Sequence, residues 1–190
     1  SVAEVGPGIA CFLLNSALFF HKAGAKMSVV GNIYEPRMRD FERQNIRVIP
    51  QFAGRLARDF RGSFDLIMAN NAFSLGGSPG LIGEDTVKTA IENATEGTLD
   101  LAKRMSRNPN ARIILAETID GLLVDRREIE KYLDVVKWVY LPTPNRESLD
   151  IWSRQADELG RHDEARLARD APNLIILKRK TGSRNSYPAR

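Results

Sequence analysis

Cysteine is almost missing from this sequence, because Cys11 is the only one among 190 residues. A single thiol cannot form an intramolecular disulfide or a thiolate metal cluster, which excludes a disulfide-stapled secreted domain and predicts a cytoplasmic protein without bound metal. Long apolar runs are missing too. The longest, residues 9–20, contains Asn15 and Ser16 and falls short of the roughly 18 residues that a membrane span needs. We expect a buried helix there and no membrane partner.

The excess of basic charge is confined to one end of the chain. The sequence holds 28 Lys and Arg against 24 Asp and Glu, a formal charge of +4. Residues 178–190 hold five of the basic residues and no acid, so residues 1–177 carry 23 basic and 24 acidic side chains. A protein that tracks nucleic acid shows a basic stripe on the fold itself. We therefore expect no nucleic-acid partner, and a solvated, disordered basic tail over residues 181–190.

Short β-rich runs alternate with longer amphipathic segments along the chain. The predicted strands are Val2–Val5, Met27–Tyr34, Arg47–Ile49, Asp65–Ala69, Arg112–Ala116, Val136–Leu141 and Leu174–Lys178. The predicted helices are Ile9–Ala23, Arg37–Gln44, Glu84–Ser106 and Arg126–Leu133. The third of these has apolar residues at roughly helical spacing: Val87, Ile91, Ala94, Leu99, Ala102 and Met105. This alternation predicts an α/β fold, in which βαβ units surround a mostly parallel sheet.

Two residues mark helix ends in this pattern. Gly24 follows the first helix and can take the left-handed conformation that ends it, and Asp125 is placed to cap the helix that begins at Arg126.

Residues 142–172 form an insert between the last two predicted strands. They are rich in charge, yet they carry one apolar stripe, made of Leu149, Trp152, Ala156 and Leu159. We expect a helical element there, with a break at Gly160 that divides it into two helices.

The most informative stretch is Glu4-Val5-Gly6-Pro7-Gly8, a strand end followed by a glycine turn and a helix. Glycine lets the backbone pass close to a ligand, and the helix that follows presents unpaired N–H groups there. A dinucleotide fingerprint needs a third small residue where Cys11 stands, and Glu4 would repel a pyrophosphate. The same carboxylate suits a cationic amino group, so a nicotinamide-dependent reductase is the less favoured interpretation.

With Ala10 where a third glycine is common, this stretch resembles the first motif of the class I S-adenosylmethionine-dependent methyltransferases. Two later stretches agree in order: residues 64–71, similar to the family's fourth strand, and residues 101–117, similar to its helix, turn and fifth strand. The resemblance covers about the first 120 residues. It implies a Rossmann-like, doubly wound, mostly parallel seven-stranded sheet whose last strand is antiparallel, in a catalytic domain over residues 1–180.

The resemblance also implies a cofactor site for S-adenosylmethionine. Glu4 would hold the methionine amino group, and Gly6 and Gly8 would allow close approach of the cofactor. Glu35 would bind the ribose of the cofactor, with Asn32 as a second candidate. Gln51 and Phe52 would contact its adenine. Asn70 would lie at the edge of the bound cofactor.

The sequence departs from the family at three places. The usual Pro-Gly-Gly before the fifth strand is Pro-Asn-Ala here, and the segment 70–73 keeps an Asn and a Phe but lacks the two prolines of amino-directed methyltransferases. No adenine or glutamine substrate is therefore inferred. The family's N-terminal helices have no counterpart before Val2, so either the sequence is a fragment or the cap comes from residues 142–172 or a partner chain. If a partner chain supplies the cap, we expect it to be a second copy of this chain, in a homodimer formed through residues 142–172.

Methyl transfer needs proximity and orientation more than covalent help, sometimes with a base. Glu117, at the end of the fifth predicted strand, is the best-placed candidate base; a helix cap or a surface carboxylate is the alternative. His21 and His162 are expected to be a packing and a solvated residue. The sequence thus predicts a methyltransferase for a small-molecule acceptor, with an RNA methyltransferase as a variant. The alternative is a methyltransferase-like binding or scaffold subunit without activity.

Overall fold

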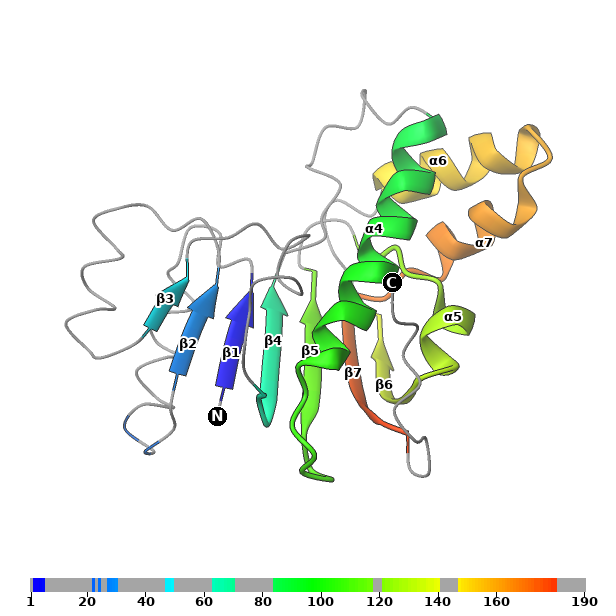
Figure 1. Cartoon of the computed structure of the whole chain (residues 1–190). Helices are drawn as coiled ribbons and strands as arrows, with labels where there is room; N and C mark the ends of the chain where they lie inside the picture. The colour runs from blue at the N-terminus through cyan, green and yellow to red at the C-terminus, as the bar shows by residue number, and fades with distance from the viewer. Residues whose placement is uncertain are drawn as a thin grey trace.

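The computed structural model of the chain describes residues 2–5, 22, 24, 27–30, 47–49, 63–70, 84–117, 121–140 and 147–180. Its strands are β1 (Val2–Val5), β2 (Met27–Val30), β3 (Arg47–Ile49), β4 (Leu66–Asn70), β5 (Arg112–Ala116), β6 (Leu133–Val139) and β7 (Leu174–Arg179). They pair in one sheet, in the order β3-β2-β1-β4-β5-β7-β6 (Figure 1). The expected α/β class and Rossmann-like sheet are confirmed.

The sheet is mixed, and its direction changes at one strand. β1, β2, β3, β4 and β5 pair in parallel, whereas β7 is antiparallel to both β5 and β6. The last strand is thus antiparallel, as the resemblance implied. Of the predicted strand Met27–Tyr34, residues 31–34 lie outside the described residues.

The described helices of at least five residues are α4 (Glu84–Lys103), α5 (Arg126–Glu130), α6 (Glu147–Glu158) and α7 (His162–Arg169). The prediction that the helix from Arg126 extends to Leu133 is wrong. It ends at Glu130, and β6 begins at Leu133, three residues before the predicted start. The fully buried Leu133 packs in the core as part of the sheet, so the strand begins earlier than the periodicity suggested.

The two predicted helix-end residues are confirmed where the structure describes them. The Asp125 side chain accepts hydrogen bonds from the backbone N–H groups of Arg127 (2.9 Å) and Glu128 (3.2 Å), which would otherwise lack partners. Gly24 has a φ of 79°, in the left-handed region that favours glycine. Most of the predicted helix Ile9–Ala23, like the predicted helix Arg37–Gln44, lies outside the described residues.

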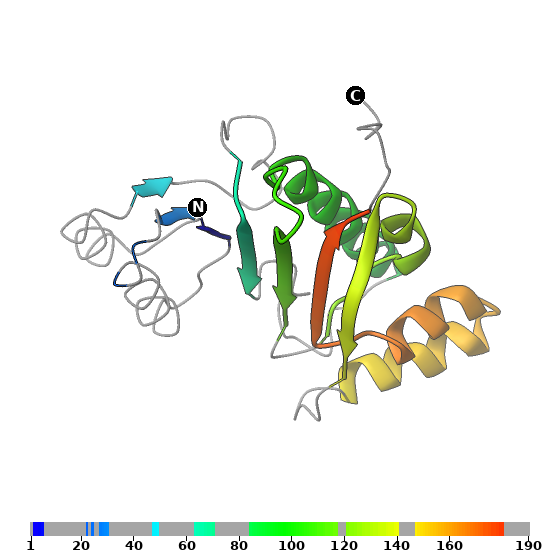
Figure 2. The ribbon, with the colours of Figure 1, turned by 90° about the horizontal axis from the view of Figure 1, so that it is seen from below.

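The main core lies between the sheet and α4 with α5, which cover the same face (Figures 1 and 2). Successive side chains of a strand point to opposite faces, so alternate residues meet these helices. In β4, β5 and β7 the buried residues are Ile67, Ala69, Ile113, Leu115, Ile175 and Leu177, whereas Met68, Ile114 and Ile176 between them are only half-buried. From α4, the stripe through Ala94 and Ala102 is buried as predicted, but Leu101 rather than Leu99 completes it.

Helices α6 and α7 form a hairpin beyond the carboxyl end of β6 (Figures 1 and 2). The predicted break is confirmed, since Gly160 lies between them with a φ of 74°. Leu149, Trp152 and Ala156 of the predicted stripe pack in a second core with Ile91 of α4. Leu159 was expected in the stripe but is 67% exposed, because α6 ends at Glu158, one residue before it.

The amino edge of the sheet is held by hydrogen bonds between distant segments. Asp65 Oδ1 accepts from the Ser106 hydroxyl (2.6 Å) and from the Asn108 amide (3.3 Å). The Arg179 guanidinium donates to the carbonyl oxygens of Met105 (2.6 Å), Ser106 (3.1 Å) and Ala102 (3.3 Å). These contacts join β4, β7 and the end of α4.

Basic residues at the start of the carboxyl-terminal segment belong to the fold. Besides Arg179, Lys178 lies 3.7 Å from the Asp134 carboxylate, and Lys180 Nζ donates to the Glu130 carbonyl (2.8 Å). Residues 181–190, the predicted disordered tail, lie outside the described residues.

Candidate functional site

The carboxyl ends of β1 and β4 lie side by side, at the point where the order of the strands in the sheet reverses. From β1 the sheet extends through β2 and β3 on one side and through β4 and β5 on the other. Open α/β sheets bind ligands at such a switch point, outside the carboxyl ends of the strands. In the sequence, the glycine motif at residues 6–8 follows β1 directly; these residues lie outside the described ones.

The strand register places two predicted site residues at this point. Glu4 is the penultimate residue of β1, paired with Val29 on one side and Met68 on the other. Val5 pairs with Ala69, so Asn70, the last residue of β4, lies one residue beyond the end of β1. The structure therefore brings the backbone positions of Glu4 and Asn70 to adjacent strand ends, as the prediction required.

The other predicted cofactor residues lie outside the described residues. They are Gly6 and Gly8 after β1, Asn32 and Glu35 after β2, and Gln51 and Phe52 after β3. Because β1, β2 and β3 are parallel, the chain leaves all three at the same edge of the sheet. Their roles stay predictions.

Glu117, the candidate base, follows β5 at this edge and is fully buried. Its backbone N–H donates to the Asn173 carbonyl (2.8 Å), and its own carbonyl accepts from the Asn173 side-chain amide (3.1 Å). A general base must come within hydrogen-bond distance of the proton that it removes. In this arrangement the carboxyl has no exposed surface through which to meet a substrate, so its catalytic role stays a prediction.

Sequence reasoning missed Asn173, which is 2% exposed and joins three strands at the carboxyl edge. Besides its two bonds to Glu117, its backbone N–H donates to the Val139 carbonyl of β6 (2.8 Å). The only signal in the sequence is a polar residue directly before an apolar strand. Such a position is also common in ordinary loops, so the pattern alone does not single it out.

His162 is solvated, as expected. Its side chain is 77% exposed and its Nδ1 lies 3.0 Å from Asp157 Oδ1. His21 lies outside the described residues. Within the described ranges, no group of three or more His, Cys, Asp or Glu side chains is placed to hold a metal ion. None of the helices described is both long and apolar enough to cross a bilayer.

Comparison with solved structures identifies the fold. No protein-family model and no curated protein sequence matches the chain. TrmN from Thermus thermophilus matches with a TM-score of 0.53 and 16% identity, over 94% of this chain and 43% of that one. The N-methyltransferase NodS from Bradyrhizobium japonicum, in complex with S-adenosyl-L-homocysteine, matches with a TM-score of 0.49 and 14% identity, over 94% and 76%.

The chain spans less than half the length of TrmN. At this identity the likeness concerns the fold and leaves the substrate open. Several of the matching structures are named methyltransferases or hold S-adenosylmethionine or S-adenosylhomocysteine. Together with the order of the strands and the antiparallel β7, the match shows that this chain has the class I methyltransferase fold.

Proposed function

We propose that this chain is an S-adenosylmethionine-dependent methyltransferase. The observation that carries the proposal is the end of β1 at the switch point of the sheet, beside the end of β4; in the sequence, the glycine motif at residues 6–8 follows directly. An acid one residue before the end of β1, and an amide at the end of β4, suit a ligand with an amino group and hydrogen-bonding edges. The sheet order supports the expectation of a doubly wound domain over residues 1–180.

The chain's own residues have binding and orienting roles in this reaction. S-Adenosylmethionine, when bound, supplies a methyl group on a sulfonium, which passes to a nucleophile in an in-line displacement. Glu4 would pair with the amino group of the methionine portion, and Asn70 would contact the cofactor's edge. Glu35 or Asn32 would accept hydrogen bonds from the ribose hydroxyls, with Gln51 and Phe52 near the adenine.

A small molecule is the proposed acceptor, because residues 1–177 carry no excess of basic charge. The proposal of a methyltransferase does not depend on whether the acceptor is a small molecule. TrmN and a ribosomal protein L11 methylase are also among the matching structures, so the acceptor is the first property to test.

Binding of S-adenosylhomocysteine, measured by isothermal titration calorimetry, tests the proposal. We expect a Kd in the micromolar range and no binding in Gly8→Val, because Gly8 is proposed to allow close approach of the cofactor. Gly24→Asn is the matched control, because an added Cβ at Gly24 meets nothing within 4 Å and Asn tolerates a positive φ. A folded wild-type chain that binds neither S-adenosylhomocysteine nor S-adenosylmethionine would rule the proposal out.

A second candidate is a subunit that binds the cofactor without turnover. The full burial of Glu117 favours it, since the best-placed base has no surface open to a substrate. Formation of S-adenosylhomocysteine by the wild-type chain separates the two, and in an active chain Glu117→Gln then tests the base. Loss of a general base lowers kcat by about 100-fold or more, with unchanged cofactor affinity. Cofactor binding without S-adenosylhomocysteine formation on any acceptor, in the wild-type chain, would instead support the second candidate.

A further inference from the structure

A groove of about 400 Å³ lies between α5, β6 and α7, on the face of the sheet that α4 and α5 cover. We call it the α5–α7 groove. Apolar side chains, among them Leu122, Val124 and Leu167, line part of it, and Trp138 and Tyr140 of the β6 end add aromatic surface. Small-ligand sites usually have volumes of about 300–1,000 Å³ and combine apolar walls with a few polar groups. The groove has both the size and the composition of such a site.

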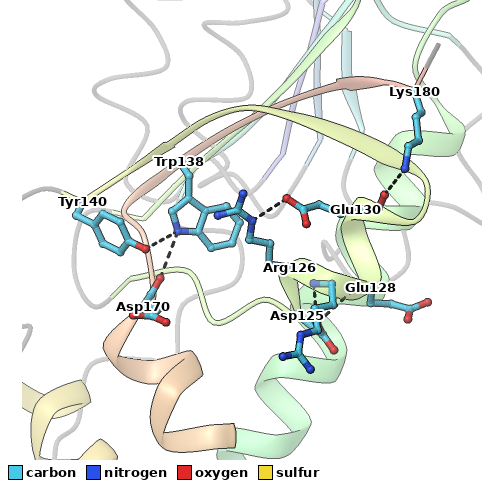
Figure 3. Close-up of polar contacts among 9 residues, drawn as sticks. Asp125, Arg126, Glu128, Glu130, Trp138, Tyr140, Asp170 and Lys180 are labelled. Atoms are coloured by element: carbon cyan, nitrogen blue, oxygen red, sulfur yellow. Dashed lines mark hydrogen bonds and ion pairs between the residues drawn. The ribbon is translucent and has the colours of Figure 1, made fainter.

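The aromatic side of the groove is fixed in place. Trp138 Nε1 donates to the Tyr140 hydroxyl (3.0 Å) and to the Asp170 carbonyl (3.3 Å) (Figure 3). The Arg126 guanidinium lies over the Trp138 ring, 5.0 Å from its centroid, and its Nε donates to Glu130 (2.7 Å). Arginine planes and aromatic rings are the surfaces on which nucleobases stack. Trp138 and Arg126 together therefore form a platform for a flat ring.

The charged side chains around the platform are of two kinds. Arg126 is paired with Glu130, and the Asp125 carboxylate caps α5. In contrast, the side chains of Arg127 and Asp170 have no ion pair within the part of the chain that the structure describes. The groove thus offers one uncommitted cation and one uncommitted carboxylate.

A second cation faces the groove from the opposite helix. Arg166 of α7 lies 3.1 Å from Asp163, but both side chains are well exposed, at 46% and 87%. Exposed ion pairs contribute only about 0–1 kcal/mol. A phosphate, with more charge and three acceptor oxygens, would therefore compete with Asp163 for Arg166. Arg127 and Arg166 then provide cations from two sides of the groove.

We propose that the α5–α7 groove binds a nucleoside monophosphate. The base lies on the Arg126–Trp138 platform, the phosphate lies at Arg127 and Arg166, and the Asp170 carboxylate accepts from N–H groups of the base. Other classes of ligand fit less well. A purely apolar molecule would cover charged groups without pairing them, and a simple anion would leave the platform and Asp170 unused.

Guanine is the base that suits Asp170 best. Its ring N–H and its exocyclic amine point in the same direction, and a carboxylate can accept both hydrogen bonds at once. Adenine has no such pair of donors. The expected order of affinity is therefore guanosine monophosphate above adenosine monophosphate.

The groove is separate from the switch point. β6 is four strands away from β1 in the sheet, which is roughly 19 Å at about 4.8 Å per strand. Its lining residues all follow Gly121, whereas the predicted cofactor residues lie between Glu4 and Asn70. The proposal consequently stands whether or not the chain transfers methyl groups.

The two tryptophans give a local measurement of binding. In a ¹⁵N-labelled chain, each indole N–H gives one NMR signal, and Trp138→Phe assigns them. Guanosine monophosphate is expected to shift the Trp138 signal and not that of Trp152, which is buried in the hairpin core. Guanosine alone and inorganic phosphate alone should each bind more weakly, because each makes only part of the contacts.

Variants test the assigned groups. Arg127→Ala and Arg166→Ala should each weaken guanosine monophosphate about 10-fold or more. Asp170→Asn should reduce the preference for guanosine over adenosine monophosphate. Arg107→Ala, which removes the same charge from an exposed site at the other edge of the sheet, should have no effect.

Three results would overturn the proposal. The first is no shift of the Trp138 signal at about 1 mM guanosine monophosphate. The second is an equal loss of affinity in Arg107→Ala, which would indicate non-specific attraction. The third is loss of the shift when S-adenosylhomocysteine saturates the chain, which would place the nucleotide in the cofactor site instead.

A free nucleotide and the 5′ end of an RNA share this chemistry, and one comparison distinguishes them. A 5′-phosphorylated trinucleotide beginning with guanosine that binds at least 10-fold more tightly than guanosine monophosphate identifies an RNA end. Equal or weaker binding identifies the free nucleotide. In both outcomes, binding must also weaken in Arg127→Ala and in Arg166→Ala.

Discussion

The two edges of the sheet differ in what their polar side chains contact. At the amino edge, Asp65 and Arg179 bind groups of the protein itself and tie β4, β7 and α4 together. At the carboxyl edge, β1 and β4 end beside each other, and the glycine motif at residues 6–8 follows β1 in the sequence. Farther along the same edge, Asn173 joins the ends of β5, β7 and β6.

This difference assigns a role to each part of the sheet. Hydrogen bonds to backbone carbonyls, as at Arg179, stabilise the fold and leave no group for a ligand. The proposed cofactor site beside the end of β1 has the opposite character, because its polar groups are expected to bind a ligand. Substitutions at the amino edge should therefore change stability, and substitutions beside the turn should change cofactor affinity.

The largest expected effect is at the amino edge, in Arg179→Met. This change removes three hydrogen bonds to the last carbonyls of α4 and the turn after it, and it should lower the free energy of unfolding by about 2–4 kcal/mol. Urea unfolding measures this. Arg107→Met, at an exposed site in the same turn, should change stability by less than about 0.5 kcal/mol. Equal stability of the two variants would contradict the structural role of Arg179.

The next largest effect is expected in Glu4→Gln, near the end of β1, and it concerns cofactor affinity. If the carboxylate pairs with the amino group of the cofactor, its loss costs about 1.5–3 kcal/mol, or roughly 10- to 100-fold in Kd for S-adenosylhomocysteine. The free energy of unfolding should change little. Glu92→Gln, on the exposed side of α4, is the control for loss of one negative charge. Unchanged affinity in Glu4→Gln would remove Glu4 from the site and erase the proposed contrast between the edges.

A third variant, Asp65→Ala, returns to the amino edge with a smaller effect. It removes the acceptor for Ser106 and Asn108, and stability should fall by about 1–2 kcal/mol. Asp100→Ala breaks only an exposed ion pair with Lys103 and should cost less than about 0.5 kcal/mol. Cofactor affinity should stay unchanged in both. A change in Kd in Asp65→Ala would show that the two edges are coupled.

Local sequence signals predicted much of this fold, and long-range contacts explain what they missed. Gly160 and Asp125 act within one turn of chain, so their types reveal their roles. Arg179 binds carbonyls 73 to 77 residues away, and its role therefore could not be derived from the sequence. In the sequence it was only counted among the five basic residues of 178–190.

For the candidate site, the sequence predicted the backbone positions of two residues, whereas the roles of all its residues stay predictions. Parallel strands must end at one edge, so the positions of Glu4 and Asn70 followed from the strand order. The burial of Glu117 did not, because it depends on Asn173 and on the elements that cover β5 and β7. A strand-end carboxylate has the same sequence pattern whether it is buried or open to a substrate.

The smallest expected effect lies in the hairpin beyond the carboxyl edge, at Asp157. Hydrogen bonds from His162 and then Arg169 lower the pKa of the Asp157 carboxyl. A carboxyl with a lowered pKa in the folded state stabilises the protein above its unfolded pKa, near 3.9, and this contribution is lost as pH falls through the folded value. The urea midpoint of the wild-type chain should therefore exceed that of Asp157→Asn at pH 7.

The difference between the two midpoints should shrink on acidification below about pH 4. Glu158→Gln, one residue further on and without an ion pair within the described hairpin, should show no such pH-dependent difference. Since the hairpin packs on α4 and not on β1, cofactor affinity at pH 7 should be the same in all three chains. A difference between the Asp157→Asn and wild-type midpoints that stays constant from pH 7 to about pH 3 would show that the carboxylate charge contributes nothing. The hairpin would then depend on its apolar core alone.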